Sequence, residues 1–323
     1  MPTPNLVIGV DAGGTSTRAV LATTSGTLCG RGRAGAGNPL AHGAQQAAAA
    51  IGTAVRSALG TYATKAVARV VVGLAGDGAL TDPATAAAFA AQWSVIGLEC
   101  PVQIVGDAVV AFASAACEAE GSVLIAGTGA SAVRITGRSI QDTAGGLGWL
   151  LGDEGAGFWL GRGAVRACVE ALSGRVQSPV LAPQVCRSLG VEDSDPTTVI
   201  TAAYGRPPLE LATLAPLVTA AARQGDPAAE GLVAAAASEL IATLAKVRGP
   251  GPTVLAGSCL TTGNPVAEAV AALAATSGEV RFAGAGQAGA AWLAAVDAGG
   301  LDVAAAAELH AAMTGHGEEG GDQ

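Results

Sequence analysis

The chain has 323 residues, half of them apolar, which predicts about two domains with sizeable cores. Seventeen basic and 26 acidic side chains give a formal net charge of −9 without any basic run, which excludes non-specific binding to nucleic acid or to an anionic membrane. No signal peptide, no continuously apolar stretch of about 20 residues and no CxxC-type motif is found, so we expect a cytoplasmic protein with reduced thiols.

The chain opens with a strand, a glycine turn and a second strand. Leu6–Val10 is apolar and β-branched, the turn Gly13–Thr15 follows Asp11, and Arg18–Ala22 resumes an apolar strand. Two interpretations stay open. The glycines, by allowing positive φ and lacking Cβ atoms, admit a phosphate to backbone N–H groups while Asp11 holds a hydrated Mg²⁺. Alternatively, this is an ordinary hairpin with a solvated aspartate.

The remaining elements of the first half alternate in type. Asn38 and Pro39 lie in a loop, where Asn38 offers an amide to a ligand or stabilises the turn. Asp107 follows a strand and precedes a helix, a position where aspartate usually caps the helix but can also accept a proton from a substrate hydroxyl. We expect strands over Leu28–Arg33, Ala68–Leu74 and Val102–Val105, and helices over Leu40–Leu59, Asp82–Trp93 and Ala108–Cys117.

The pattern then restarts about one domain length later. Ser122–Ala126 is an apolar strand, Gly127–Ser131 a glycine turn and Ala132–Thr136 a second strand. The segments DAGGTSTRAV and AGTGASAVRI both place an arginine in the second strand. This similarity indicates a structural duplication with a ligand between the halves, although Gly/Thr turns are common enough to match by chance.

A glycine-rich loop over Ala144–Gly157 contains Asp153 and Glu154 and precedes a helix over Phe158–Leu172. So many glycines suggest close approach of the backbone to a ligand, whereas the two acids could simply complement the helix dipole. Further helices are expected over Pro179–Leu189, Thr197–Tyr204, Leu209–Arg223, Pro227–Val247, Pro265–Thr276, Gln287–Val296 and Leu301–Met313, and strands over Thr253–Ala256 and Glu279–Phe282.

Several common motifs are excluded. GxGxxG occurs at Gly30–Gly35 and Gly284–Gly289, but in a chain with 47 glycines chance matches are expected, and no strand follows the second to complete a βαβ unit. GxxxxGK[ST] is absent, and the three histidines give no Ser-His-Asp arrangement.

The segments DAGGTSTR, Asn38-Pro39, Gly106-Asp107-Ala108, GTGAS, GGLGWLLGDEGAGFWLG and LAGS resemble the N-acetylglucosamine kinase branch of the sugar kinase/Hsp70/actin superfamily, also called BadF/BadG-type ATPases. The resemblance covers nearly the whole chain, and GDEG after the GG-x-G-W loop is its most specific part. It implies an α/β protein with two RNase H-like (actin-like ATPase) domains, each a mixed β-sheet flanked by helices, with an inter-domain cleft. The expected domains are 1–117 and 118–300, with a helical insertion at 178–248, helix 301–313 packing back on the first domain and a flexible tail at 315–323.

The resemblance also implies a role for each matching residue. Asp107 would be the catalytic base, and Asp11 would hold Mg²⁺ through water. Sugar would bind to Asn38, Asp107, Thr128, Gly145, Gly146 and Asp153, and ATP to Gly13, Gly14, Thr15, Gly127, Thr128, Gly129, Gly257 and Ser258. The chain departs from the family at Ala75-Gly76, which puts one sugar contact in doubt, and at Ala130 and Ser131, which puts an N-acetyl contact in doubt.

The resemblance implies an ATP- and Mg²⁺-dependent amino-sugar kinase, which we expect to be cytoplasmic and homodimeric and to phosphorylate the 6-hydroxyl of glucosamine. Glucosamine is favoured because its ammonium needs a carboxylate, and Asp142, Asp153 and Glu154 flank the glycine loop; a solvated Asp142 is the simpler interpretation of that residue. The alternatives are an N-acetylglucosamine kinase, a non-catalytic sugar-sensing regulator and a dehydratase-activating ATPase. The regulator would need a DNA-binding module, for which no room precedes Leu6, and the activator an iron–sulfur site, which isolated cysteines do not supply.

Overall fold

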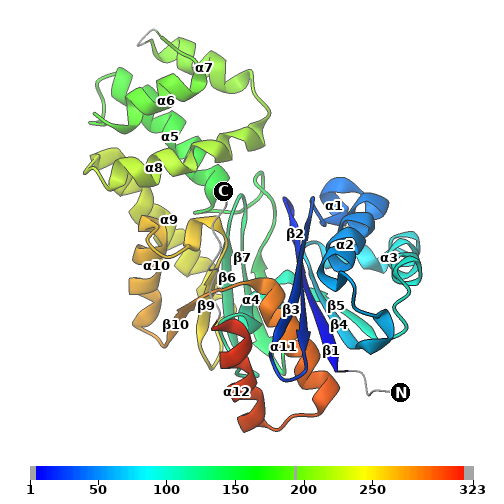
Figure 1. Ribbon diagram of the computed structural model, residues 1–323. Helices are drawn as coiled ribbons and strands as arrows, with labels where there is room; N and C mark the ends of the chain where they lie inside the picture. The colour runs from blue at the N-terminus through cyan, green and yellow to red at the C-terminus, as the bar shows by residue number, and fades with distance from the viewer. Residues whose placement is uncertain (1–4, 193–194, 316–323) are drawn as a thin grey trace. The chain divides into compact units, whose positions relative to one another are not determined.

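The computed structural model describes residues 5–192 and 195–315, which form two compact units (Figure 1). Unit 1 contains residues 5–119, 136–140 and 283–315, and unit 2 contains residues 120–135 and 141–282. The expected boundaries therefore differ, because residues 136–140 and 283–300 belong to unit 1 and not to the second domain. Except for Gly315, the expected tail at 315–323 lies outside the described residues.

Close packing against the first strand explains this assignment. Helix α11 (Gly286–Gly299) packs against β1 (Leu6–Ala12), and a Cβ on Gly9 would collide with the backbone of Gln287 and Ala291. The motif at Gly284–Gly289 serves the same packing, since Cβ atoms on Gly286 and Gly289 would lie 2.7 Å from the Asp11 carboxylate and 2.5 Å from the Ser114 nitrogen. These glycines admit neighbouring chain segments and not a dinucleotide.

Unit 1 is built on a five-stranded mixed sheet in the order β3-β2-β1-β4-β5. β1 pairs with β2 antiparallel and with β4 parallel, and β5 continues parallel to β4. Helix α2 (Ala44–Leu59) contacts β2 and β3 closely because Cβ atoms on Gly30 and Gly32 would collide with its backbone. The other strands are β2 (Thr17–Thr23), β3 (Leu28–Ala34), β4 (Val67–Leu74) and β5 (Val102–Gly106).

The helices of unit 1 follow the predicted order with one break. The helix expected over residues 40–59 is interrupted at Gly43, whose φ of 83° lies outside the helical region. The remaining helices are α1 (Pro39–His42), α3 (Pro83–Ile96), α4 (Asp107–Ala113), α12 (Val303–Thr314) and the 3₁₀ turns η1 (Thr64–Ala66) and η2 (Asp77–Thr81).

Unit 2 repeats the same sheet. Taken from the other end, its strand order β8-β7-β6-β9-β10 matches β3-β2-β1-β4-β5 of unit 1. As β1 does in unit 1, β6 pairs antiparallel with the next strand, β7, and parallel with β9, and β10 continues parallel to β9. The duplication expected from the two glycine turns is thus confirmed in the topology. The strands are β6 (Gly121–Ala126), β7 (Ala130–Thr136), β8 (Ser139–Gly145), β9 (Thr253–Ala256) and β10 (Val280–Phe282). β8 was not predicted, because this edge strand is largely exposed and lacks apolar alternation.

The helical part of unit 2 surrounds an alanine- and leucine-rich core that includes Leu160, Leu181 and Leu240. Helix α9 (Pro227–Ala245) is long and apolar enough to span a membrane by length and composition, but one side of it, with Leu240 and Leu244, packs into this core against α8 (Ala215–Ala222) and α10 (Pro265–Ala275). The helices are α5 (Gly157–Leu172), α6 (Leu181–Leu189), α7 (Pro196–Tyr204), α8 (Ala215–Ala222), α9 (Pro227–Ala245), α10 (Pro265–Ala275), η3 (Pro208–Leu214) and η4 (Ser258–Leu260).

One carboxylate joins two of these helices. Asp226 is fully buried and caps α9 by accepting hydrogen bonds from the N–H groups of Ala228 (3.1 Å) and Ala229 (3.0 Å). It also accepts from Val180 (2.9 Å) and Leu181 (3.0 Å) at the start of α6. Burial alone would raise the pKa of Asp226, but these backbone donors hold it below its ordinary value.

Candidate active site

In unit 1, the carboxyl ends of three parallel strands meet at one sheet edge. Asp11 of β1 is in register with Gly73 of β4, which is in register with Val105 of β5. Asp107 begins α4 directly after β5. This edge is where open α/β sheets bind ligands, and the register brings the predicted base and the predicted metal ligand to it.

The surroundings of Asp11 disfavour its charge. Burial, and then the negative charge of Asp107, raise the pKa of Asp11 to about 6, while Arg18 acts in the opposite direction. The first residue of α11 lies against this carboxylate, since a Cβ on Gly286 would stand 2.7 Å from Asp11 Oδ2. Sequence reasoning missed Gly286 because no local signal links residues so far apart.

Asp107 is the first residue of α4, and Gly106, not Asp107, is the N-cap. Burial raises the pKa of Asp107, the N–H of Ala108 lowers it, and the Asp77 carboxylate adds to the rise. A half-buried carboxylate with a raised pKa suits proton acceptance better than a solvated cap would.

The first glycine turn is held from the side by two contacts. Gly37 donates its N–H to the Gly13 carbonyl (2.9 Å), and His42 Nε2 lies 3.0 Å from the Gly14 carbonyl oxygen. Neither Gly13 nor Gly14 has a positive φ, so that part of the sequence argument was wrong. The turn instead leaves open space beside its backbone. No atom lies within 4 Å of a Cβ on Gly14, and the neighbouring Thr15 is exposed.

Asn38 has a structural role that also orients its amide. Its Oδ1 caps α1 by accepting from the N–H groups of Leu40 (2.8 Å) and Ala41 (3.3 Å). A Cβ on Gly76, where φ is 76°, would stand only 2.8 Å from this oxygen. Gly76, where the sequence departs from the family pattern, therefore has to be a glycine because Asn38 lies so close to it.

In unit 2, the second glycine turn is fixed to helix α5. The N–H groups of Gly157 and Phe158 donate to the carbonyls of Gly127 (2.8 Å) and Thr128 (3.1 Å), and Gly127 N–H donates to the Gly129 carbonyl (2.9 Å). These two N–H groups at the start of α5 are therefore occupied. The exposed Thr128 remains turned to solvent beside them.

Asp153 is the most unusual residue of the predicted set. It is only 8% exposed and has a φ of 62°, one of two described non-glycine residues with positive φ. Its Oδ1 has no hydrogen-bond partner among the described residues, and a Cβ on Gly129 would collide with its Oδ2. Strained backbone and an unpaired buried acceptor commonly mark functional positions.

The glycine-rich loop folds back on the second turn. Gly146 donates its N–H to the Ala130 carbonyl (2.8 Å), and a Cβ on Gly145 would approach Ala130 and Ser131 at 2.9 and 3.3 Å. This conformation needs positive φ at both glycines. Asp142, in contrast, is exposed on β8, where its carboxylate accepts a hydrogen bond from Thr143 N–H (2.8 Å).

The second turn also lines a cavity of about 300 Å³. Gly127 and Thr128 form one wall, and Ser258 and Asn264 belong to the segment after β9. A Cβ on Gly257 would collide with the Ala126 carbonyl, so its φ of 93° and missing side chain set this close approach. The volume lies at the lower end of the range for small-molecule sites.

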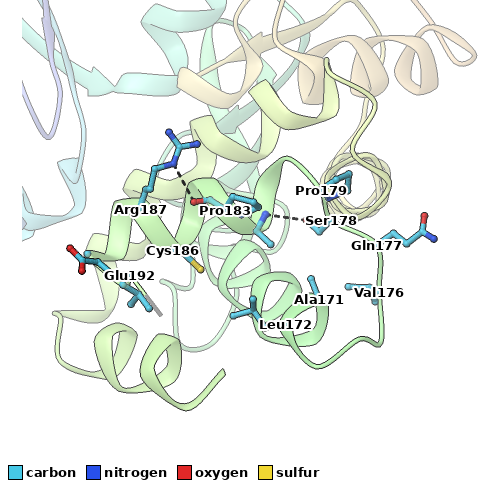
Figure 2. A pocket seen from close by; sticks show the side chains of 13 residues that line it. Ala171, Leu172, Val176, Gln177, Ser178, Pro179, Pro183, Cys186, Arg187 and Glu192 are labelled. Atoms are coloured by element: carbon cyan, nitrogen blue, oxygen red, sulfur yellow. Dashed lines mark hydrogen bonds between the residues drawn. The ribbon is translucent and has the colours of Figure 1, made fainter. Parts of the chain in front are cut away.

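A larger cavity lies elsewhere in unit 2. About 920 Å³ in volume, it is formed by the ends of α5 and α6 and the segments around them, and none of the predicted site residues lines it (Figure 2). Cys186 lines this cavity, and its Sγ lies 3.5 Å from that of Cys168, a proximity that the sequence spacing did not predict. Its wall is mostly apolar, and its polar side chains are Gln177, Ser178, Arg187 and Glu192.

Both sequence and fold resemble known proteins. The BadF/BadG/BcrA/BcrD ATPase family matches residues 8–294, which is most of the chain. An N-acetylmuramic acid/N-acetylglucosamine kinase from Clostridium acetobutylicum is 26% identical over 144 residues, 45% of this chain and 47% of that protein. The match therefore spans about half the length of this curated relative.

Solved structures share the fold over almost the whole chain. A protein from Chromobacterium violaceum provisionally described as an N-acetylglucosamine kinase gives a TM-score of 0.71 at 25% identity, covering 90% of this chain and 99% of that one. A ROK family glucokinase from Streptomyces griseus, in complex with glucose and AMPPNP, gives 0.56 at 22% identity with the same coverage, and shows the fold alone. The predicted fold class is thus confirmed.

Proposed function

The chain belongs to the BadF/BadG/BcrA/BcrD ATPase family, and from this premise we propose that it is an ATP-dependent amino-sugar kinase that phosphorylates the 6-hydroxyl of glucosamine. Relatives named as sugar kinases support the coarser assignment, an ATP-dependent sugar kinase. The main observation in favour of glucosamine as the substrate is Asp153, a buried carboxylate with an unpaired oxygen beside the second glycine turn.

Phosphoryl transfer depends mostly on positioning and on stabilising charge. In this proposal Asp107 accepts the proton of the sugar hydroxyl as that oxygen attacks the γ-phosphate. Its raised pKa brings the carboxylate closer to neutral pH, where a base works best. The neighbouring Asp77 contributes to that rise and thus to the strength of the base.

ATP would bind to the two glycine turns, Gly13–Thr15 and Gly127–Gly129, with Gly257 and Ser258 near the adenosine. No group of three or more potential protein ligands for a metal occurs among the described residues. Mg²⁺ fits this donor set, because it commonly takes one or two carboxylates, here Asp11, and completes its shell with water and phosphate oxygens. When bound, it neutralises charge on the transferred phosphoryl group.

The sugar would contact Asn38, Thr128, Gly145, Gly146 and Asp153. Asp153 Oδ1 can accept from a hydroxyl or from the ammonium of glucosamine, and an ionic partner gives the stronger hydrogen bond. The Ala130 carbonyl is already occupied by Gly146 N–H, so it is less available to an N-acetyl amide. We assign Asp142, an exposed carboxylate, as a second partner for the ammonium of glucosamine.

N-acetylglucosamine is the second candidate, because the relatives are named for it. A coupled ATP-turnover assay with and without Mg²⁺, over glucosamine, N-acetylglucosamine and glucose, separates the two. We expect turnover to require both sugar and Mg²⁺, with the highest kcat/KM for glucosamine. A higher kcat/KM for N-acetylglucosamine would make that sugar, and not glucosamine, the assigned substrate. Sugar-independent ATP hydrolysis would refute the kinase assignment.

We also propose that the protein acts in the cytoplasm as a homodimer. ATP and reduced thiols are both available there. Light scattering coupled to gel filtration tests the dimer, since a mass of 31.1 kDa would identify a monomer.

A further inference from the structure

Two cysteine side chains meet between helices α5 and α6 of unit 2. Cys168 lies in the second half of α5 and Cys186 lies in α6, and their Sγ atoms are 3.5 Å apart. Both cysteines are free, so the two sulfur atoms are in contact without being bonded. An S–S bond is about 2.05 Å long, and the sulfur atoms therefore need to approach by only about 1.5 Å to form one.

The packing of α6 keeps these two side chains together. Asp226 accepts hydrogen bonds from two N–H groups at the start of α6, which fixes that end of the helix. Cys168 Sγ also lies 3.5 Å from the carbonyl oxygen of Ala182, one turn before Cys186 in the same helix. The Cys168 side chain thus points at α6, and Cys186 is held within its reach.

The two sulfur atoms differ in their access to a small reagent. Cys186 is half-buried and lines the cavity of about 920 Å³ (Figure 2). Cys168 is fully buried and is not part of the cavity wall. Burial, and then the neighbouring Cys186, raise the pKa of Cys168 to about 12, so its sulfur stays protonated near neutral pH. A reagent that enters the cavity therefore meets Cys186 first.

We propose that Cys186 and Cys168 form a modification site at which hydrogen peroxide converts the thiol pair into a reversible disulfide. The Cys186 thiolate attacks one peroxide oxygen, so that an S–O bond forms, the O–O bond breaks, and the released hydroxide takes up the proton lost by the thiol. The Cys168 sulfur then attacks the Cys186 sulfenic acid. An S–S bond forms, the S–O bond breaks, and the Cys168 proton leaves with the oxygen as water. The two sulfur atoms together lose two electrons, which the peroxide gains.

In this reaction Cys168 protects its partner and the product joins two helices. A sulfenic acid that meets no thiol is oxidised further to a sulfinic acid, a step that thiol reductants do not reverse. The disulfide would link α6 to α5, whose first N–H groups hold the second glycine turn. A transient, redox-sensing disulfide is the kind that occurs in a reducing compartment. This inference does not depend on the proposed function.

Thiol counting and peptide mapping on the full chain test the pair. The reduced protein, with its six free cysteines, is treated with equimolar hydrogen peroxide. We expect the loss of two thiols per chain, a linked peptide pair containing Cys168 and Cys186 in a non-reducing digest, and recovery of both thiols with a dithiol reductant. Cys117→Ala removes another half-buried thiol and should leave this link unchanged.

Two variants separate the roles of the two sulfur atoms. In Cys168→Ala, excess peroxide should leave Cys186 as a sulfinic acid that reduction does not reverse, and equal sulfinic acid at Cys186 in the wild type would overturn the resolving role of Cys168. Cys186→Ser, at the more exposed position, should leave Cys168 reduced under the equimolar treatment. The absence of a Cys168–Cys186 link in the oxidised wild type, or a link between other cysteines in its place, would overturn the proposal.

Discussion

Replacing Asp107 by asparagine separates catalysis from stability. The change keeps the size of the side chain and removes its ability to accept a proton. A general base contributes about 10²- to 10⁴-fold, so kcat should fall by that factor, which corresponds to about 3–5 kcal/mol of barrier. The measurement is coupled ATP turnover at saturating sugar and MgATP.

The same variant should not lose stability in proportion. The pKa of Asp107 is raised in the folded state, chiefly by burial, so folding disfavours the ionised form. Below the unfolded pKa of about 3.9 both states are protonated and Asp107 has no effect; as pH rises, ionisation costs the wild type stability. The free energy of unfolding of Asp107→Asn should therefore increase relative to wild type between pH 4 and 7, offset by a helix-dipole loss of about 0.3–1 kcal/mol.

Asp82→Asn is the matched control with the opposite sign. Asp82 caps α3, and hydrogen bonds from the Thr85 hydroxyl (2.8 Å) and N–H (2.9 Å) lower its pKa. Its stabilisation is present above the unfolded pKa and is lost as pH falls through the folded pKa. This variant should lose stability relative to wild type as pH rises, with kcat unchanged. Wild-type kcat in Asp107→Asn, or the same pH trend in both variants, would refute the reasoning.

Four further substitutions test the site and the residues that support it. Gly129→Ala places a Cβ against the buried Asp153 carboxylate and should cost about 1–3 kcal/mol in thermal unfolding, whereas Gly14→Ala meets open space and should stay within about 0.5 kcal/mol. Asp226→Ala leaves four backbone N–H groups without their acceptor and should lower the free energy of unfolding by about 2–5 kcal/mol. Because the pKa of Asp226 is lowered, that loss should shrink as pH falls through its folded pKa, and a constant loss across pH would contradict the capping argument. Asp142→Ala should raise the KM for glucosamine much more than the KM for ATP; equal changes in steady-state kinetics would leave Asp142 as a solvated residue of β8.

The sequence by itself determined those features whose signals are local. The strand, glycine turn and strand over residues 6–22 and their repeat over residues 122–136 predicted the duplicated sheet, because alternating burial and turn chemistry act over a few residues. Helix starts marked by Pro83 and Pro227 were found for the same reason. The family resemblance added the expected roles of Asp11 and Asp107, the two acids at the strand ends.

Only the tertiary structure decided the features that depend on distant residues. The contact of Gly286 with Asp11 moves α11 into unit 1, and Asp226 caps a helix that starts 45 residues before it, at Leu181. The buried, unpaired oxygen of Asp153 depends on the packing of Gly129. Burial, pKa and unpaired polar atoms follow from which segments pack together, and no local pattern in the chain encodes that.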